Sequence, residues 1–599
     1  MKSIKTIIAS AVIVAGSLIS VAQVNVGTLK VYNDGQKVSE LNIEDIESME
    51  LSEVGTVSSI TEAASSLRRA IHYMLNYSHA PSNSWAPHKY EHQRSLLIDN
   101  YAGYWTTTKA NFAFGSSLPT LYASENGYMN EVFNVSVPVF TDSRPALVSA
   151  EKLGASYLKA LALIVQAYGA QELVDFYGVL PMKDLRMWDG RVVKCESGPD
   201  VYKQILSDLD EAVDILKQSQ PTAAELAMAE GSTDDSLSLF DCQWQRWVKF
   251  ANSIKLRMAM NMVDYIDPDP TYGPDNKPFV AKNIAEEAYN DEIGVLSAGD
   301  RDIAYVGDHE CCIYWIGESW NDIRLNASME NILKRYGHPL LKVWFAENEY
   351  PIKDRSGVIA PKGIYGVRSG IMMEDTGNSS SGGYGPFARL SEAQQYMSQP
   401  LMKVAEVNFL RAEGALRGWN MGGSTKDLYE VGVRSSFVEW GLTDMQATDY
   451  LSTDTIVPVD YVDYYNRSNS IEGRVNVPVK WSEDDTQEVK LEKIITQKWI
   501  ANFPMGAEAW TTFRRTGYPR IFPVKYSNLG NDDVDVEKQI RRLKYGVNSD
   551  RFALDFHIDV AVALGSQDIC GKPVFWDINS RTWEKGANGQ YIINNHLDD

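Results

Sequence analysis

The side chains that most often perform catalysis are sparse in this chain and lack the spacing of known catalytic motifs. The sequence has no HExxH, GxSxG or Walker phosphate-binding motif, and no GxGxxG loop that follows a strand. His88 and His92 are four residues apart and could share one helix face, but two His residues alone do not make a zinc site. We therefore expect no catalytic residue, no metal and no cofactor, and interpret this His pair as packing or surface residues.

Acidic residues are the most frequent charged groups, and two of them could in principle act as a glycosidase pair. Asp and Glu number 79 against 57 Lys and Arg, which gives a formal net charge of −22. A glycosidase needs two carboxylates at a set separation in space, which a sequence does not show, so a secreted hydrolase stays open as an alternative. The same charge balance argues against nucleic acid as the main partner, because phosphate binding needs clustered Lys and Arg.

Aromatic residues with a polar atom are unusually frequent in this sequence. The chain has 31 Tyr and 15 Trp against 18 Phe. Tyr and Trp combine a flat apolar ring with a hydrogen-bonding group, so some of them can form stacking surfaces that remain in contact with water. The simpler interpretation, that they fill the core, covers most of them.

The first 22 residues have the pattern of an export signal. Lys2 and Lys5 precede an apolar run over residues 7–19, and Ser20-Val21-Ala22 provides the small residues that a signal peptidase requires. We predict cleavage after Ala22, so that the exported protein begins at Gln23. No later stretch is apolar for about 18 residues, so no membrane-spanning helix is expected.

Cysteine usage gives no indication of a lipid anchor or of a disulfide framework. The apolar run has no Cys near its end, so the sequence shows no lipoprotein acylation site. The five Cys residues are an odd number, and Cys311 and Cys312 are adjacent, which suits neither a CxxC metal site nor a redox motif. We interpret the five as isolated, mostly buried thiols.

Beyond the signal, a short β-rich segment precedes a long helical body. Residues 27–51 alternate between apolar and polar positions around Asn33-Asp34-Gly35, a hairpin signal. Helical periodicity then dominates. The expected helices are residues 146–177, 198–220, 244–263, 404–417, 426–440 and 491–503, and the expected loops are residues 264–278, 307–320, 376–386 and 457–481. Long loops on a rigid scaffold commonly carry binding function.

Two of these helices form an antiparallel pair joined by the glycine-containing turn at residues 418–424. Such a pair is the unit of tetratricopeptide-like stacks, although no clean 34-residue consensus is present. The helix at residues 146–177 carries interleaved small residues, which let neighbouring helices approach closely.

Three segments closely resemble the SusD/RagB family of nutrient-binding outer-membrane proteins. Residues 404–442 are VAEVNFLRAEGALRGWNMGGSTKDLYEVGVRSSFVEWGL, residues 491–524 are LEKIITQKWIANFPMGAEAWTTFRRTGYPRIFPV, and residues 247–260 are WVKFANSIKLRMAM. With weaker matches elsewhere, the resemblance covers about residues 57 to 580. Within these segments we expect Arg514 and Arg515, beside Trp510 and Phe513, to form ion pairs and stack in the core.

The resemblance implies a mainly α SusD-like fold with tetratricopeptide-like helix pairs and long loop insertions, plus the short N-terminal β leader. We therefore divide the chain into a signal peptide at residues 1–22, a leader at residues 23–56 and a nutrient-binding domain at residues 57–599. The implied function is non-enzymatic. Such a protein captures oligosaccharide or polysaccharide at the outer membrane, facing the cell surface, and delivers it to a SusC-like TonB-dependent transporter during polysaccharide utilisation. In some family members the captured nutrient is a peptide.

Relatives stack sugars on aromatic residues in loops of the N-terminal half and of the middle insertion. By position, the candidate aromatic platform here is Trp85, Tyr104, Trp105, Tyr314, Trp315 and Trp320, and the candidate polar contacts are Asn321, Asp322 and Arg324. The alternative for Tyr104 and Trp105 is that they end a buried helix.

The sequence departs from the family pattern in three places. The lipobox Cys is absent, which leaves direct lipid anchoring in doubt. The leader replaces the usual linker, and the DPRL-like turn of the family is Gly337-His338-Pro339-Leu340 here.

Overall fold

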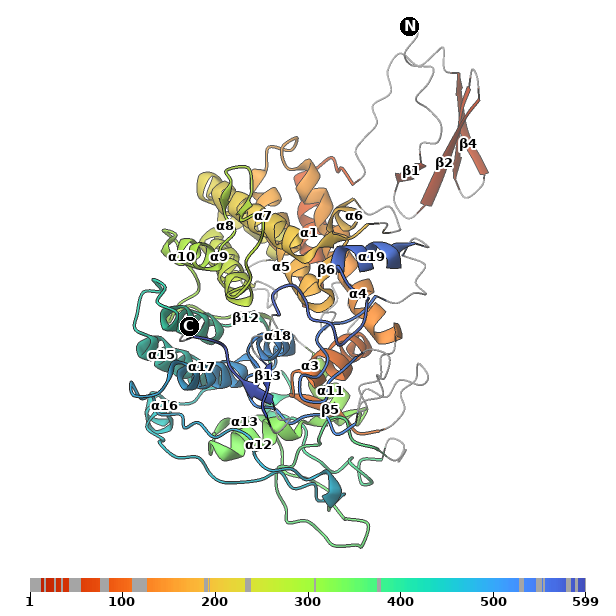
Figure 1. The fold of residues 1–599 in the computed structure, drawn as a ribbon. Helices are drawn as coiled ribbons and strands as arrows, with labels where there is room; N and C mark the ends of the chain where they lie inside the picture. The colour runs from red at the N-terminus through yellow and green to blue at the C-terminus, as the bar shows by residue number, and fades with distance from the viewer. Residues whose placement is uncertain are drawn as a thin grey trace. The chain divides into compact units, whose positions relative to one another are not determined.

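A computed structural model describes most of the chain (Figure 1). It gives the backbone of four strands between residues 12 and 42. It also describes residues 55–75, 86–109, 126–187, 192, 194–231, 239–305, 309–373, 379–526, 533–545, 552, 555–577, 583–587 and 591–597. The chain divides into two compact units, Met1–Ser58 and Ser59–Asp599, each with its own internal contacts.

The first unit is a small antiparallel sheet. Its strands follow the chain in the order β1 (Val12–Ala15), β2 (Leu18–Asn25), β3 (Thr28–Asn33) and β4 (Gln36–Asn42). Asn33 pairs with Gln36, so β3 and β4 form a hairpin where the sequence predicts one. Strands β1 and β2 begin earlier than the expected leader, and β2 crosses the predicted cleavage site between Ala22 and Gln23.

The second unit is mainly helical, as expected. Its helices are α1 (Ile60–Tyr73), α2 (Pro87–Tyr90), the π-helix η2 (Glu91–Ile98), α3 (Asp99–Tyr101), α4 (Asn126–Ser149), α5 (Ser156–Tyr177), α6 (Met182–Arg186), α7 (Gly198–Ser219), α8 (Ala223–Glu230), α9 (Trp244–Asn261), α10 (Ala281–Asn290), α11 (Cys312–Glu318), α12 (Ala327–Arg335), α13 (Leu340–Trp344), α14 (Val404–Leu416), α15 (Thr425–Glu439), α16 (Asp444–Leu451), α17 (Gln487–Asn502), α18 (Gly506–Thr516) and α19 (Phe556–Leu564), with short 3₁₀ turns at Glu392–Gln394 and Arg467–Asn469.

Short antiparallel strand pairs join the loops between these helices. They are β5 (Trp105–Thr107) with β11 (Ile323–Leu325), β6 (Val179–Leu180) with β7 (Glu196–Ser197), β8 (Thr271–Tyr272) with β9 (Lys277–Pro278), β10 (Ile303–Tyr305) with β12 (Gln399–Met402), and β13 (Trp583–Lys585) with β14 (Tyr591–Ile593).

Helices that follow one another in the chain pack side by side. Helix α5 packs against α4 and α7, and α9 against α7 and α10 (Figure 1). Helix α14 packs against α15 and α17. Small residues make this packing close: a Cβ added at Gly169 of α5 would lie 2.9 Å from Cγ1 of Val139 in α4. The expected helix-pair architecture is therefore confirmed.

Local sequence sets several of these helix ends. Ser197, the N-cap of α7, accepts a hydrogen bond from the backbone N–H of Asp200, with Pro199 in the first turn. The predicted continuous helix at residues 146–177 is wrong, because Pro145 lies inside α4 and α5 begins only at Ser156. The chain turns between them at Gly154, whose φ of +66° favours glycine. The predicted loop at residues 307–320 also contains a helix, α11.

The three segments that carry the family resemblance meet in a buried network of ion pairs. Arg257 of α9 forms two hydrogen bonds of 2.8 Å with Glu406 of α14, and Arg515 of α18 forms two of 2.6 Å with Glu413 of α14. The Arg514 guanidinium lies 3.7 Å from the ring centroid of Trp510. The expected buried ion pair is therefore formed by Arg515 and the expected stacking by Arg514.

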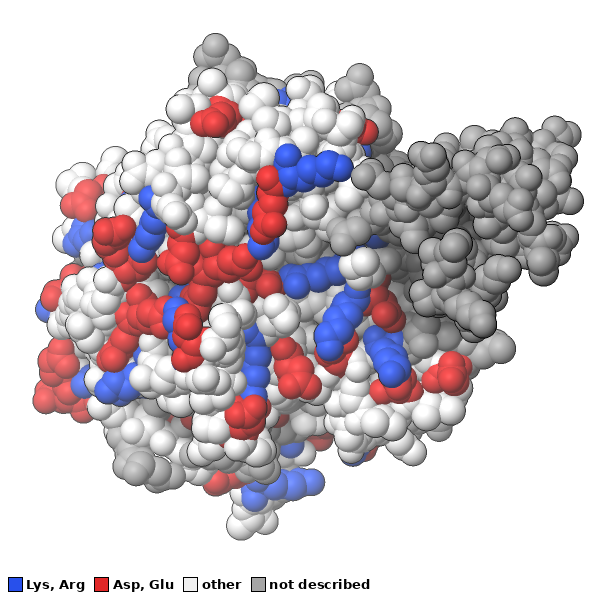
Figure 2. Space-filling model, turned by 90° about the horizontal axis from the view of Figure 1, so that it is seen from above, with Lys and Arg blue, Asp and Glu red and all other residues white. Residues whose placement is uncertain are grey.

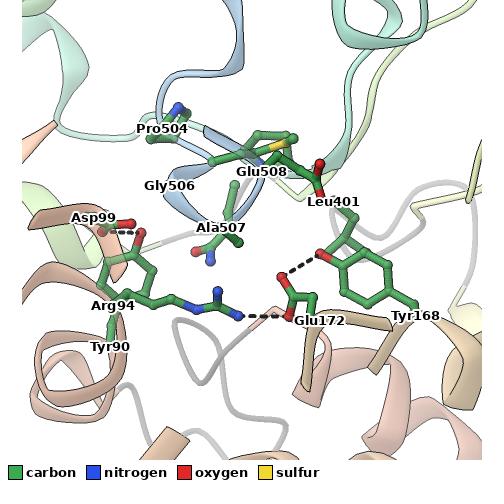
Figure 3. Close-up of a pocket in the computed structure, with 13 residues that line it drawn as sticks. Tyr90, Arg94, Asp99, Tyr168, Glu172, Leu401, Pro504, Gly506, Ala507 and Glu508 are labelled. Atoms are coloured by element: carbon green, nitrogen blue, oxygen red, sulfur yellow. Dashed lines mark hydrogen bonds and ion pairs between the residues drawn. The ribbon is translucent and has the colours of Figure 1, made fainter. Parts of the chain in front are cut away.

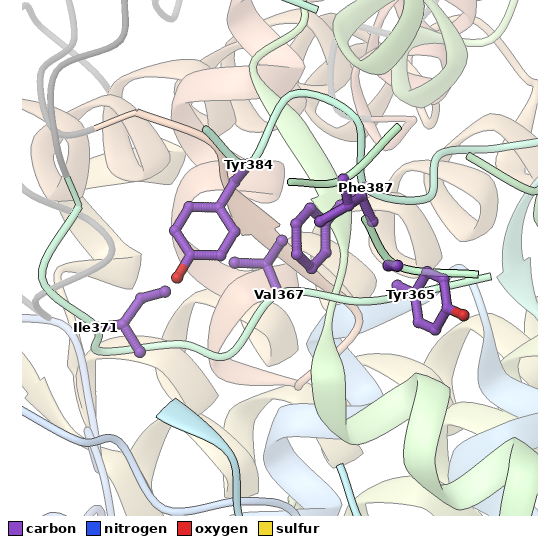
Figure 4. Packing of buried hydrophobic residues seen from close by; sticks show 7 residues of the cluster. Tyr365, Val367, Ile371, Tyr384 and Phe387 are labelled. Atoms are coloured by element: carbon purple, nitrogen blue, oxygen red, sulfur yellow. The ribbon is translucent and has the colours of Figure 1, made fainter. Parts of the chain in front are cut away.

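A second core supports the loop-rich end of this unit. It consists of Ile352, Ala360, Tyr365, Val367, Ile371, Tyr384 and Phe387, with Met373, Tyr464 and Tyr465 packed against it (Figure 4). The Tyr384 hydroxyl donates a 2.8 Å hydrogen bond to Asp463. This core fixes the backbone of residues 384–388, which lies against the candidate site.

Acidic side chains gather on one face of the described surface (Figure 2). Figure 2 shows one face on which Asp and Glu gather with Lys and Arg scattered among them, and its described part has no continuous basic area. Among the described helices, none combines the length and the apolar composition that a membrane span needs.

Candidate ligand-binding surface

Two segments far apart in the sequence form the candidate site. Strands β5 and β11 pair antiparallel, which places Thr106 opposite Arg324 and Trp105 opposite Leu325. Helix α11 packs against α2 and η2. The fold therefore brings together the two described groups of predicted ligand residues, at positions 104–105 and 314–324. Trp85 lies outside the described residues.

Three of the predicted aromatic residues lie on α11 or just after it. The Cys311 thiol caps this helix by accepting from the backbone N–H of Tyr314 at 3.4 Å. Tyr314, Trp315 and Trp320 are each half-buried, and the indole nitrogen of Trp315 is buried. They lie on a short helix and its C-terminal turn rather than in an irregular loop.

The polar residues after α11 are structural rather than free to meet a ligand. Arg324 is fully buried, and its guanidinium donates to the backbone carbonyls of Gly385, Gly317 and Ile323 at 2.6–2.9 Å. Its remaining bond goes to the side-chain oxygen of Asn321. Burial, then the nearby Arg389, lower the pKa of Arg324 to about 9. The expectation that Arg324 contacts ligand is corrected, because its donors are engaged in tying α11 to residue 385.

Asn321 and Asp322 are also buried. Asn321 adopts a positive φ of 60° at the turn that ends α11. The Asp322 carboxylate forms an ion pair of 2.5 Å with Lys109, and its backbone carbonyl accepts from the Thr108 N–H at 3.1 Å. Both residues are less than a tenth exposed, so they shape the turn beneath the aromatic residues instead of facing solvent.

Tyr104 and Trp105 belong to the core, which corrects their assignment to the platform. Tyr104 is fully buried and donates a 2.5 Å hydrogen bond from its hydroxyl to the carbonyl of Trp499. Trp105 is 1% exposed and packs edge-on against Phe345 and against Phe503. The alternative was right that these residues are buried, but they follow helix α3 rather than end it, and Trp105 begins strand β5.

The titratable groups beneath α11 have shifted protonation. Burial, and then the neighbouring Asp322 carboxylate, raise the pKa of Glu91. Burial, then the nearby His88 and Lys89, lower the pKa of His92 to about 4, so this imidazole is neutral at pH 7. The rings of His88 and His92 are 6.2 Å apart. Within the described part of the chain, no cluster of three or more His, Cys, Asp or Glu side chains could hold a metal ion.

A small pocket lies between residues of η2, α5, β12 and the start of α18 (Figure 3). It is lined by Tyr90, Arg94, Asp99, Tyr168, Glu172, Gln399, Pro400, Leu401, Pro504, Met505, Gly506, Ala507 and Glu508. Arg94 extends toward Glu172 and pairs with it at 2.8 Å, while the Tyr90 hydroxyl donates to Asp99 at 3.4 Å. Glu172, Gln399 and Met505 are the half-buried residues of this lining.

The sequence analysis missed this pocket because four separate segments contribute to it. The available signal was charge inside apolar runs, such as Asp99 after Leu96-Leu97-Ile98 and Glu172 within α5. A second, smaller hollow lies at the start of α11. It is lined by Cys311, Cys312 and Ile313, among others, and shares Tyr90, Gln399 and Pro504 with the larger pocket.

A family model described as SusD-like, Susd and RagB outer membrane lipoprotein, matches residues 52–577 of this chain. A solved structure described as a chitin-binding SusD homologue from Flavobacterium johnsoniae is 30% identical, with a TM-score of 0.70 over 86% of this chain and 99% of that one. SusD homologues from Bacteroides vulgatus and Bacteroides thetaiotaomicron are 26% and 27% identical, with TM-scores of 0.71 and 0.69. They cover 87% and 86% of this chain and 98% and 99% of their own. No curated protein sequence matches it.

Proposed function

Because this chain belongs to the SusD-like family of outer-membrane lipoproteins that includes SusD and RagB, we propose that it captures oligosaccharide or polysaccharide at the cell surface. In this proposal it delivers the glycan to a SusC-like TonB-dependent transporter and performs no chemistry. The protein is exported, associates with the outer membrane and faces the exterior. The observation that carries the binding role is the half-buried aromatic surface of Tyr314, Trp315 and Trp320.

The rigidity of this surface supports binding. Arg324 fixes the C-terminal end of α11 through three backbone carbonyls, and Arg389 pairs with Glu318 of the same helix at 2.6 Å. A ring held in place loses little conformational entropy when a sugar stacks on it, which favours affinity. The charged groups beneath are paired with one another, as in Lys109 and Asp322, which favours a structural over a catalytic role.

Chitin oligosaccharide is the first ligand to test, because a homologue of 30% identity is described as chitin-binding. Affinity electrophoresis against a polysaccharide panel identifies the glycan class. A peptide library tests the alternative nutrient class, and slow cleavage of any panel member would show a hydrolase instead.

The decisive variants are Trp315→Ala and Trp320→Ala, each measured for ligand affinity and for melting temperature. Losing one stacked ring costs about 1–3 kcal/mol, or about fivefold to about 150-fold in affinity. A half-buried ring contributes less to folding than a buried one, so we expect the melting temperature to change little.

Trp105→Ala is the matched control for these variants, because this buried ring should cost about 3–5 kcal/mol of stability. Full affinity in both surface variants would place the site elsewhere. A large fall in their melting temperatures would assign Trp315 and Trp320 to the core.

A further inference from the structure

The most exposed aromatic residues of the described chain are three tyrosines, and two of them border α11. Tyr350, Tyr396 and Tyr526 are 37%, 54% and 45% exposed, respectively. Tyr396 belongs to a segment bonded to the start of α11, and Tyr350 to a segment bonded to its last residue. Exposed rings that gather around one half-buried aromatic helix indicate a binding surface, whereas single scattered ones need no explanation.

Tyr396 is held at the N-terminal end of α11. The carbonyl of Gln395 accepts a 2.7 Å hydrogen bond from the backbone N–H of Cys311, the N-cap of the helix. The Gln395 amide also donates to the Glu310 carboxylate. On the other side of Tyr396, Met397 is buried and lines the hollow that contains Cys311. The backbone on both sides of Tyr396 is therefore fixed to the start of the helix, while Tyr396 itself remains exposed.

Tyr350 is held at the C-terminal end of α11 by two carboxylates that share one guanidinium. Arg389 pairs with Glu318, the last residue of α11, at 2.6 Å and with Glu349 at 2.7 Å. The Asn348 side chain donates a 2.9 Å hydrogen bond to the backbone carbonyl of Tyr350. The segment that presents Tyr350 is therefore fixed beside the end of the helix.

Tyr314 lies between these two ends, because charged groups from both act on its hydroxyl. Burial first, and then three nearby carboxylates, raise the pKa of Tyr314; the carboxylates are those of Glu318, Glu392 and Glu310. The first of them belongs to the side of Tyr350, and the other two to the side of Tyr396. We call Tyr396, Tyr314 and Tyr350 the tyrosine row.

The charges around the tyrosine row determine the chemistry of a ligand that it can accept. They are four carboxylates and one guanidinium, from Glu310, Glu318, Glu349, Glu392 and Arg389. Ionised carboxylates accept hydrogen bonds and cannot donate them, so they suit the hydroxyl groups of a sugar. An anionic glycan would be repelled, and an apolar protein surface would remove water from the carboxylates without replacing it. The row therefore suits a neutral carbohydrate whose rings stack on the tyrosines.

We infer that Tyr350 and Tyr396 extend the aromatic surface of α11 at both ends, and that the tyrosine row selects a neutral glycan by its chain length; this rests on the proposed glycan capture. The seven residues of α11 rise about 10 Å along the helix axis. A row that reaches from one end of this helix to the other is longer than a disaccharide can cover. A longer oligosaccharide stacks on more rings without a further loss of translational freedom, so its affinity is higher.

Calorimetry of the full chain with chitobiose, chitotetraose and chitohexaose tests the length preference. On a site for two sugars, chitohexaose would gain only about fivefold over chitobiose, because it offers five registers. We expect the measured ratio of affinities to exceed this value, with chitotetraose between the two. A ratio of about fivefold or less would overturn the inference and leave glycan capture intact.

Variants at the two ends locate the preference in the tyrosine row. Tyr350→Ala and Tyr396→Ala are each expected to weaken chitohexaose binding about fivefold or more, and to leave chitobiose binding on α11 unchanged. Tyr350→Phe and Tyr396→Phe keep the ring and should keep the affinity. Tyr526→Ala is the matched control, because Tyr526 is similarly exposed and its backbone N–H is bonded to Gly370, which lies in neither bordering segment.

Full chitohexaose affinity in both end variants would overturn the inference, and so would an equal loss in Tyr526→Ala. Trp315→Ala and Trp320→Ala report on the proposed function independently of these results. If the unaltered chain binds another polysaccharide of the panel and not chitin, the same variants are compared by their retardation in affinity electrophoresis on that polymer. Binding to no glycan at all would overturn the inference together with the proposed function.

Discussion

At the scale of single residues, burial decides which polar side chains of this protein can meet a ligand. Arg324 and Asp322 have the chemistry of sugar contacts, yet the first is bonded to backbone carbonyls and the second to Lys109. Trp315 and Trp320, in the same segment, are instead only half-buried. Residue type alone therefore assigns function to the wrong members of this short segment.

His338, in the turn where this chain departs from the family, makes the protein sensitive to acid. Burial lowers the pKa of His338 to about 3, and its Nδ1 accepts from the Leu340 N–H at 3.2 Å. Between pH 6.5 and about 3 the unfolded chain binds a proton that the folded one does not. The free energy of unfolding should then be fully retained above pH 6.5 and fall by up to about 1.4 kcal/mol per pH unit below it.

The measurement is urea unfolding at pH 7 and pH 5 for the native chain and for His338→Asn, whose Oδ1 can replace the acceptor. Other groups titrate in both proteins, so only the difference between the two reports on His338. We expect the variant to lose less stability than the native chain as the pH falls. A difference that is the same at both pH values would contradict the assignment.

The sequence predicted the structural role of some of these residues but not of others. The pairing and stacking of Arg514 and Arg515 were predictable, because charged residues beside Trp510 in an otherwise apolar motif need buried partners. The burial of Tyr104 was not, because its partner Trp499 lies almost 400 residues away in the chain. The pocket that contains Asp99 and Glu508 was likewise hidden, since its lining comes together only in three dimensions.

At the scale of helices, the packing of α14 on α15 depends on one glycine. A Cβ added at Gly432 of α15 would lie 2.8 Å from two ring atoms of Phe409 in α14. Gly→Ala within an exposed helix usually stabilises by about 1 kcal/mol, but an extra methyl in a tight core typically costs about 1–3 kcal/mol. Because an aromatic ring in a packed core has little room to move, we expect Gly432→Ala to destabilise the protein.

Chemical denaturation measures this sign directly. Gly317→Ala in α11 is the matched control, because its added Cβ would have no neighbour nearer than 3.7 Å. The control should be neutral or slightly stabilising. Stabilisation by Gly432→Ala would mean that the two helices can separate without cost, contrary to the close packing described above.

Helix positions were more predictable than helix ends and short helices. The segments at 198–220, 244–263, 404–417 and 491–503 emerged because each has a long apolar period, and the first and last also have a capping residue. The break between α4 and α5 was missed because both helices are apolar across the turn at Gly154. Helix α11 has only seven residues, too few for a period, and depends on contacts with α2 and η2.

At the scale of the whole chain, the second unit is held together by charges that its three family motifs share. Glu413 connects α14 to α18 through Arg515, and Arg257 connects α9 to α14 through Glu406. Burial alone would raise the pKa of Glu413, but Arg515 and Arg417 outweigh it and hold the value at about 2. Removing one partner of such a pair leaves the other charge buried without a counter-charge. The three motifs therefore depend on one another although they lie far apart in the sequence.

Export is expected to change the first unit, because the predicted cleavage after Ala22 falls inside strand β2. Cleavage would remove β1 and leave residues 23–25 of β2 beside the β3–β4 hairpin. A two-stranded hairpin alone is at best marginally stable in water.

We therefore expect trypsin to cut the exported protein first within residues 23–58, for example at Lys30 or Lys37. The second unit, which has its own internal contacts, should keep its melting temperature. Intact-mass analysis before digestion should find Gln23 as the first residue. The Ala22→Phe variant, which blocks cleavage, keeps all four strands and should resist trypsin longer. Equal resistance of the two proteins, or a lower melting temperature after trimming, would show that the leader folds or stabilises the body in the mature protein.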